Sequence, residues 1–194
     1  SLTWLLICNS QAQISISPDL FDPLKVTRIT DGITFDGITD ESAWQSIPAF
    51  PMVMLMPVPG NEPTESSIIR IAYDDVYFYV SGMMYYKDVK FLKAIGKQRD
   101  YNDLSCDWFG LTLDTYNDRQ NAVQFSTNPN GIRSDATIKN DVMDEDADRN
   151  RSWNTFWDVK TAINDHGWSA EMRIPFSSLR FQTLENTTLM GIIL

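Results

Sequence analysis

Short apolar runs separated by turn residues run along most of the chain and predict an all-β fold. No stretch keeps the helical spacing of apolar positions for more than about two turns. Clusters of Asp, Asn, Gly and Pro stand between the runs, and these residues end strands and form turns. We expect strands at 50–56, 68–73, 76–84, 108–114, 122–128, 159–164 and 168–174, with single helical turns at 40–46 and 176–179.

The turn sequences indicate antiparallel neighbours. Asp74 and Asp75 separate two predicted strands as a tight hairpin, Asp-His-Gly at 165–167 separates two others, and Asn-Pro-Asn-Gly at 128–131 is a strong turn sequence. Short connections of this kind join strands that lie side by side in one antiparallel sheet. The predicted architecture is an antiparallel β-sandwich.

Alternation assigns two sides to the segment 108–113. Phe109, Leu111 and Leu113 share one side and are predicted to face the core. Trp108 then lies on the opposite side, together with a glycine and a threonine. A tryptophan on the outer side of a sheet is either open to a ligand or covered by a loop, and the sequence leaves both alternatives open.

The segment 122–128 extends the same pattern. Val123 and Phe125 are predicted to face inward, which leaves Gln124 and Asn128 on the outer side. If the two segments are neighbours, one sheet face combines an aromatic ring with amides and hydroxyls. That composition suits a sugar, because the ring stacks on the C–H face of a pyranose and the polar groups bind its hydroxyls.

Composition limits the functional classes. The 194 residues carry 26 acidic against 16 basic side chains, a net charge of −10 with 43% hydrophobic residues. A chain this rich in apolar residues folds around a core, and its charge disfavours a nucleic-acid partner. His166 is the single histidine and lies in a predicted turn, and no nucleophile-elbow, P-loop or dinucleotide motif occurs. We therefore expect no enzyme activity and no organic cofactor.

The acidic loop at 141–151 is a candidate Ca²⁺ site. Asp144, Asp146 and Asp148 supply clustered carboxylates, the hard oxygen ligands that Ca²⁺ prefers. The loop lacks EF-hand spacing, and a solvated charged loop is the alternative.

The first residues predict export. The apolar run 2–8 is followed by small and polar residues up to Ala12, as in the back half of a secretory signal peptide. We expect 1–12 to be a signal remnant, 13–28 an extended lead-in, and the protein to reach the periplasm or outer membrane of a bacterium. A buried N-terminal strand is the alternative for the apolar run. The run 190–194 is apolar, so we expect the sandwich domain at 29–194 to lack its C-terminal strands.

An ordered set of motifs resembles the family 9 carbohydrate-binding modules, as found at the N-terminus of exported bacterial proteins with a DUF5916-type C-terminal barrel. The motifs span most of 29–194. They are D-G-x-x-D-E-x-x-W at 36–44, I-A-Y-D-D at 71–75, the pair Asp107 and Asp114, F-S-T-N-P-N-G at 125–131, and G-W-S-A-E-M-R-I-P-F-S-S-L-R-F at 167–181.

The resemblance implies a β-sandwich without catalysis that grips a terminal sugar between two tryptophans. One family tryptophan falls on Leu104, a family acidic residue on Gly110 and a family arginine on Ser126, whereas the amide at Asn128 is retained. Trp108 is a candidate replacement for the lost stacking platform.

Two further tryptophans, Trp153 and Trp157, flank the acidic loop and are candidates for a second wall of the site, with core and loop packing as the alternative. The sequence thus predicts a non-catalytic carbohydrate-binding module linked to glycan capture or degradation, with carbohydrate and a downstream domain of the same polypeptide as partners. The alternative is an accessory domain that packs on a downstream outer-membrane barrel and binds no sugar. The candidate binding residues are Trp108, Gln124, Asn128, Trp153 and Trp157.

Overall fold

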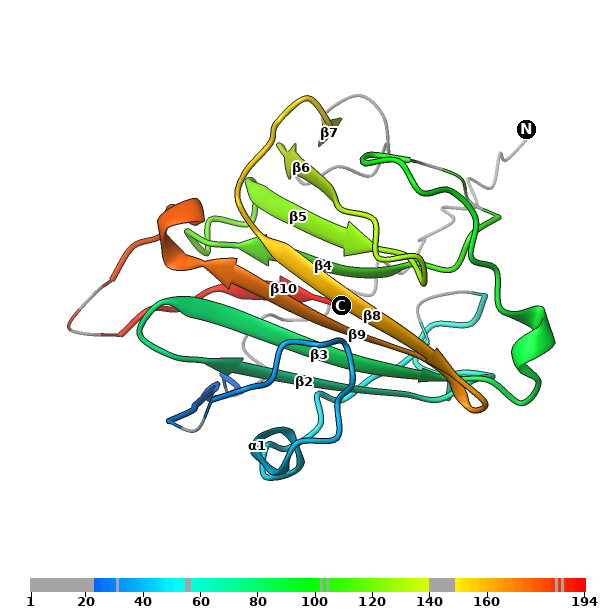
Figure 1. The fold of residues 1–194 in the computed structure, drawn as a ribbon. Helices are drawn as coiled ribbons and strands as arrows, with labels where there is room; N and C mark the ends of the chain where they lie inside the picture. The colour runs from blue at the N-terminus through cyan, green and yellow to red at the C-terminus, as the bar shows by residue number, and fades with distance from the viewer. Residues whose placement is uncertain are drawn as a thin grey trace, which may run out of the picture.

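Two five-stranded sheets lie face to face in the computed structural model (Figure 1). Sheet A has the order β1-β2-β3-β9-β8 and sheet B the order β10-β4-β5-β6-β7. All pairings are antiparallel except that of β1 with β2. The structure describes residues 23–30, 32–54, 57–101, 103, 105–139, 149–183, 185 and 187–194. The predicted β-sandwich is confirmed.

The strands of sheet A are β1 (Thr27–Arg28), β2 (Ser67–Tyr73), β3 (Tyr77–Tyr85), β8 (Asp158–Asn164) and β9 (Gly167–Pro175). Those of sheet B are β4 (Phe109–Asp114), β5 (Ala122–Thr127), β6 (Ser134–Ile138), β7 (Arg149–Asn150) and β10 (Gly191–Ile193). The described residues also contain three single turns of helix: α1 (Ser42–Gln45), η2 (Val89–Phe91) and η3 (Phe176–Ser178). In the part of the chain that the structure describes, no helix is long and apolar enough to cross a membrane.

Six of the seven predicted strands are present within one or two residues, and both predicted helical turns form as α1 and η3. The prediction of a strand at 50–56 is wrong for 50–54. The amide of Phe50 bonds to the carbonyl of Ile69 at 2.7 Å, but Pro51 follows directly and has no N–H to continue a ladder.

The core between the sheets confirms the predicted alternation in β4. Phe109, Leu111 and Leu113 are at most 4% exposed and pack in one cluster with Phe125 of β5. Apolar residues of β2, β3 and β9 contribute the other side of this cluster: Ile69, Ile71, Phe78, Val80, Trp168, Ala170, Met172 and Ile174.

The segment before β2 covers the outer face of sheet A. Trp44 of α1, Ile47 and Ala72 of β2 form a second buried cluster, and Figure 1 shows α1 on the side of sheet A remote from sheet B. Glu171 of β9 is only 1% exposed under this cover. Alternation along β9 assigns Glu171 to the outer face of sheet A, but alternation does not show that another segment of the chain lies over that face.

Candidate functional site

The outer face of sheet B carries small polar side chains on its two central strands. Gly110 lies opposite Ser126 and Thr112 opposite Gln124, and all four are partly exposed. The Gln124 amide donates to the Thr112 hydroxyl at 3.3 Å, and the Ser126 hydroxyl donates to the carbonyl of Ser134 at 3.4 Å. We refer to these four residues as the β4–β5 face.

Gly110 leaves a shallow trough in this face. A Cβ atom placed there would contact only Cβ of Ser126 at 3.5 Å and the carbonyl oxygen of Phe125 at 3.6 Å, both on the neighbouring strand. Apart from Gly110 itself and its two neighbours in the chain, no other described atom comes within 4 Å of that position. The β4–β5 face is therefore open above Gly110.

Trp108 directly precedes β4 and is partly exposed. The side chain of Trp108 packs against neither buried cluster. Trp108 stands two positions before Gly110, so the alternation of β4, extended by one residue, assigns it to the side of Gly110 and Thr112. Its indole N–H donates to the carbonyl of Asp103 at 2.9 Å. With the N–H satisfied internally, the faces of the indole ring are what Trp108 offers to a ligand.

Hydrogen bonds also order the residues just before Trp108. Asp103 accepts from the Ser105 hydroxyl and from the Tyr101 hydroxyl. Together with the Ser105 amide these bonds hold the pKa of the Asp103 carboxyl below its usual value. The turn that carries the partner of the Trp108 indole is thus fixed by a charged acceptor.

Asn128 lies inside the fold, which corrects its prediction as a sugar contact. It is 0% exposed, its Nδ2 donates to the carbonyl of Ile95 at 2.6 Å, and its Oδ1 accepts from the amides of Asn130 and Ile132. β5 ends at Thr127, so the alternation that assigned Asn128 to the outer side no longer applies. Asn128 anchors the loop before β4 and is not available to a ligand.

Trp153 and Trp157 lie on the core side of sheet B and do not face Trp108. Both pack edge-to-face on Phe125, with ring centroids 6.1 Å and 5.4 Å away, and Trp157 is 2% exposed. The second wall predicted for the sugar site is therefore absent at these two positions, and the alternative of core and loop packing describes them. Gln124 is the candidate residue that the structure brings onto one face with Trp108.

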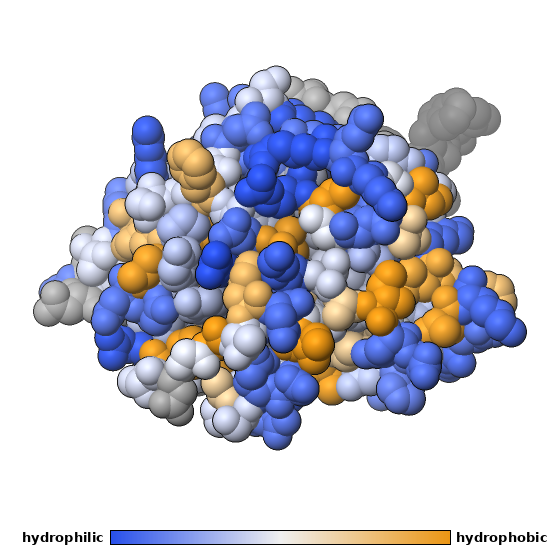
Figure 2. Space-filling view, viewed as in Figure 1, coloured by the Kyte–Doolittle hydropathy of each residue, from blue (hydrophilic) through white to orange (hydrophobic). Residues whose placement is uncertain are grey.

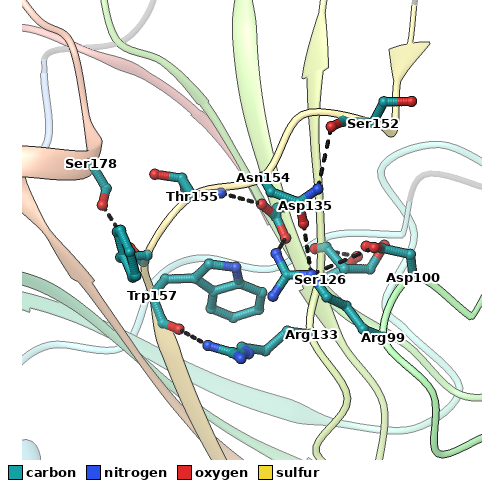
Figure 3. A network of polar contacts seen from close by, with 12 residues as sticks. Arg99, Asp100, Ser126, Arg133, Asp135, Ser152, Asn154, Thr155, Trp157 and Ser178 are labelled. Carbon is teal, nitrogen blue, oxygen red and sulfur yellow. Dashed lines mark hydrogen bonds and ion pairs between the residues drawn. The ribbon is translucent and has the colours of Figure 1, made fainter.

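An ion pair that the sequence did not predict, between Arg99 and Asp135, also holds the loop that leads to Trp108 (Figure 3). The Arg99 guanidinium donates to Oδ1 of Asp135, which is 1% exposed, and to Oδ1 of Asn154 at 2.8 Å. Oδ2 of Asp135 accepts from the amide of Thr155 at 2.8 Å. Arg99 thereby ties the loop that leads to Trp108 to β6 and to the segment after β7.

The candidate Ca²⁺ ligands Asp144, Asp146 and Asp148 lie outside the described residues. A different group of carboxylates, from Asp36, Glu41 and Glu171, has one oxygen each within 4.8 Å of the others. Both oxygens of Glu171 already accept N–H donors, and burial raises the pKa of this carboxyl despite those donors. This cluster secures the cover of sheet A, because Glu171 binds groups of the covering segment with both of its oxygens.

Comparisons with known proteins give structural matches only, since no family model and no curated protein matches this chain. A family 9 carbohydrate-binding module from Caldicellulosiruptor kristjanssonii, in complex with glucose, superposes with a TM-score of 0.60 at 18% identity, over 88% of this chain and 75% of that one. A structure of such a module from the same organism with cellotriose gives a TM-score of 0.55 at 18% identity, over 86% and 72%. This chain has the fold of a family 9 carbohydrate-binding module. The resemblance found in the sequence motifs is thus confirmed at the level of the fold.

Proposed function

We propose that this chain is a non-catalytic carbohydrate-binding module and that the β4–β5 face, together with Trp108, is where it binds sugar. The shared fold supports the class of function, because the two similar modules carry glucose and cellotriose. The choice of site rests on Gly110, which adds no side chain to the face beside Trp108 and where an added Cβ would make only two contacts with the neighbouring strand, at ordinary distances.

The chemistry of this face suits a neutral pyranose. A ring face of Trp108 stacks on the apolar C–H face of the sugar. The Gln124 amide and the Thr112 hydroxyl, which bond weakly to one another at 3.3 Å, exchange that bond for bonds to sugar hydroxyls. Gly110 keeps the floor of the site low enough for the sugar to approach the sheet.

The same residues account for binding without catalysis. Glycoside hydrolysis needs a pair of carboxyl groups on either side of the scissile bond, and the β4–β5 face and Trp108 contain no ionisable side chain. The acidic groups at the two ends of β4 serve the fold: Asp107 accepts the amide of Lys93, and Asp114 accepts three amides of the following turn.

The wider setting is also part of the proposal. The apolar run 2–8 and the small residues after it support export to a bacterial envelope, and a larger polypeptide that captures or degrades glycans is the setting we infer. An accessory domain without sugar binding is the competing function. It is favoured by Ile193, which is 68% exposed at the edge of sheet B.

Titration of the full chain with glucose and cellotriose tests the proposal, by calorimetry and by tryptophan fluorescence. We expect saturable binding that Trp108→Ala abolishes and that Gly110→Val weakens at least tenfold, because the added side chain fills the trough. Ala162→Val, on β8 of the other sheet, is the matched control and should bind like the parent. Absence of saturable binding, or equal affinity in all four proteins, would favour the accessory-domain function instead.

A further inference from the structure

A second hollow lies on the other sheet, against the outer side of β8 and β9. Its volume is about 250 Å³, and its polar and aromatic lining comes from Phe35, Arg133, Asp158, Lys160 and Arg173. The lining of this hollow shares no residue with the β4–β5 face, so we treat the two as separate sites. Figure 2, which views the molecule from the same side as Figure 1, shows hydrophobic residues in several separate groups among hydrophilic ones.

The charge of this hollow is opposite to that of the chain. Three cationic side chains and one carboxylate line it, a local excess of two positive charges in a chain with a net charge of −10. Cations gathered in a concave surface attract small anions, and the low-dielectric walls strengthen that attraction.

Arg173 is held rigidly in the wall of the hollow. Its Nε and Nη2 both donate to Oδ2 of Asp158, at 3.0 Å and 2.9 Å. Its guanidinium also lies 4.4 Å from the ring centroid of Phe35 and 5.4 Å from that of Tyr77. The pairing neutralises Asp158, and the two rings fix the plane of the guanidinium.

The other two cations keep donors unused. Nη1 of Arg133 donates to the carbonyl of Trp157 at 2.8 Å (Figure 3) and lies 3.9 Å from Oδ1 of Asp158. No described residue accepts a hydrogen bond from the remaining guanidinium nitrogens of Arg133 or from Nζ of Lys160. These donors are therefore available to a ligand in the hollow.

We propose that this hollow binds the carboxylate of a small polar molecule, with the uronate unit of an acidic glycan as the expected class. A guanidinium presents paired N–H groups that match a carboxylate, and Lys160 adds a second charge. The volume lies below the roughly 300–1,000 Å³ of sites for drug-sized ligands, which suits one sugar unit. The partly buried ring of Phe35 supplies an apolar wall.

Nuclear magnetic resonance titration of the full chain with glucuronate, glucose and inorganic phosphate tests this site at low salt. We expect glucuronate to shift the resonances of β8 and of the Arg133 side chain saturably, with glucose causing no such shift. Lys160→Gln should weaken glucuronate binding at least threefold, and Lys160→Glu at least tenfold. Lys97→Gln removes the same charge from an exposed position outside the hollow and should bind like the parent.

The assignment would be overturned by the absence of a saturable shift with glucuronate, by equal affinity in the Lys160 and Lys97 variants, or by phosphate bound at least tenfold more tightly than glucuronate. The Gly110→Val variant separates this proposal from the sugar-binding one. It should lose glucose and cellotriose but keep glucuronate, whereas loss of glucuronate in that variant would place the anion on the β4–β5 face and refute the second site.

Discussion

Glu171 accepts a hydrogen bond at Oε1 from the indole nitrogen of Trp44, 2.8 Å away and 127 positions earlier in the chain. Its Oε2 accepts from the amides of Asp36 and Gly37, at 3.0 Å and 2.9 Å. One strand position of β9 therefore holds both ends of the D-G-x-x-D-E-x-x-W segment. A fourth hydrogen bond, from the Ser169 hydroxyl to the carbonyl of Gly37 at 2.6 Å, fixes the same cover from a position two residues before Glu171.

Replacing Glu171 by Gln should destabilise the fold by about 2–3 kcal/mol, since a buried donor is left without an acceptor. The amide has one oxygen, and its NH₂ group would face either the Trp44 indole or the two backbone amides. Urea denaturation measures the change, with Glu62→Gln at an exposed position as the control. Equal midpoints for the two variants would show that the acceptor geometry of Glu171 does not matter.

The stability that depends on Glu171 should fall as pH rises. Burial raises the pKa of this carboxyl above its ordinary value of 4.5, so the folded chain binds the proton more tightly than the unfolded chain. The contribution is complete below the ordinary value and is lost as pH rises through the raised one. The difference in unfolding free energy between parent and Glu171→Gln should therefore be larger at about pH 4 than at about pH 7. A difference that grows with pH would contradict the raised pKa.

The strands were predictable wherever apolar alternation faced the core, as in 108–113. β6 was not, because its inward position opposite Phe125 is Asp135, an acidic residue whose burial depends on its pairing with Arg99. The covered outer face of sheet A was also hidden in the sequence. Whether a polar residue at an outward position meets water or another segment depends on contacts such as that between Glu171 and Trp44, which no local pattern encodes.

Gly37→Ala should cost about 3 kcal/mol or more. Gly37 has a φ of +92°, and a Cβ there would come within 2.7 Å of the backbone nitrogen of Thr161 in β8, so conformational strain and a backbone clash add. Gly60→Ala is the matched control: its φ is +85° with nothing within 4 Å of the added atom, and it should cost about 1 kcal/mol. Thermal unfolding of both variants measures the difference. Equal shifts in Tm would show that the close approach to β8 costs nothing beyond the strain.

The candidate sugar site was predicted in part. Trp108 and Gln124 were found because alternation in β4 and β5 extends to them. Asn128 was misplaced because its strand stops one residue earlier, and Trp157 because a tryptophan beside a charged loop gives no local sign of packing on Phe125. The basic hollow was not predictable, since Arg133 lies in the turn before β6 of sheet B, Arg173 lies on β9 of sheet A, and the two meet through Asp158.

Arg99→Gln should both destabilise the fold and weaken sugar binding. Its side chain is 33% exposed but its partner Asp135 is fully buried, and a buried carboxylate without its cation is costly, so we expect a loss of about 2 kcal/mol. The loop that ends at Trp108 also loses its hydrogen bonds to β6, which should raise the Kd for cellotriose.

Arg28→Gln is the control for this variant. It breaks the exposed pair of Arg28 with Asp75, in which the two side chains are 48% and 83% exposed. Because exposed pairs stabilise little, this control should leave Tm and Kd at the parent values. If Arg99→Gln unfolds at the parent midpoint and binds with the parent Kd, the pair between Arg99 and Asp135 neither stabilises the fold nor positions the loop that leads to Trp108.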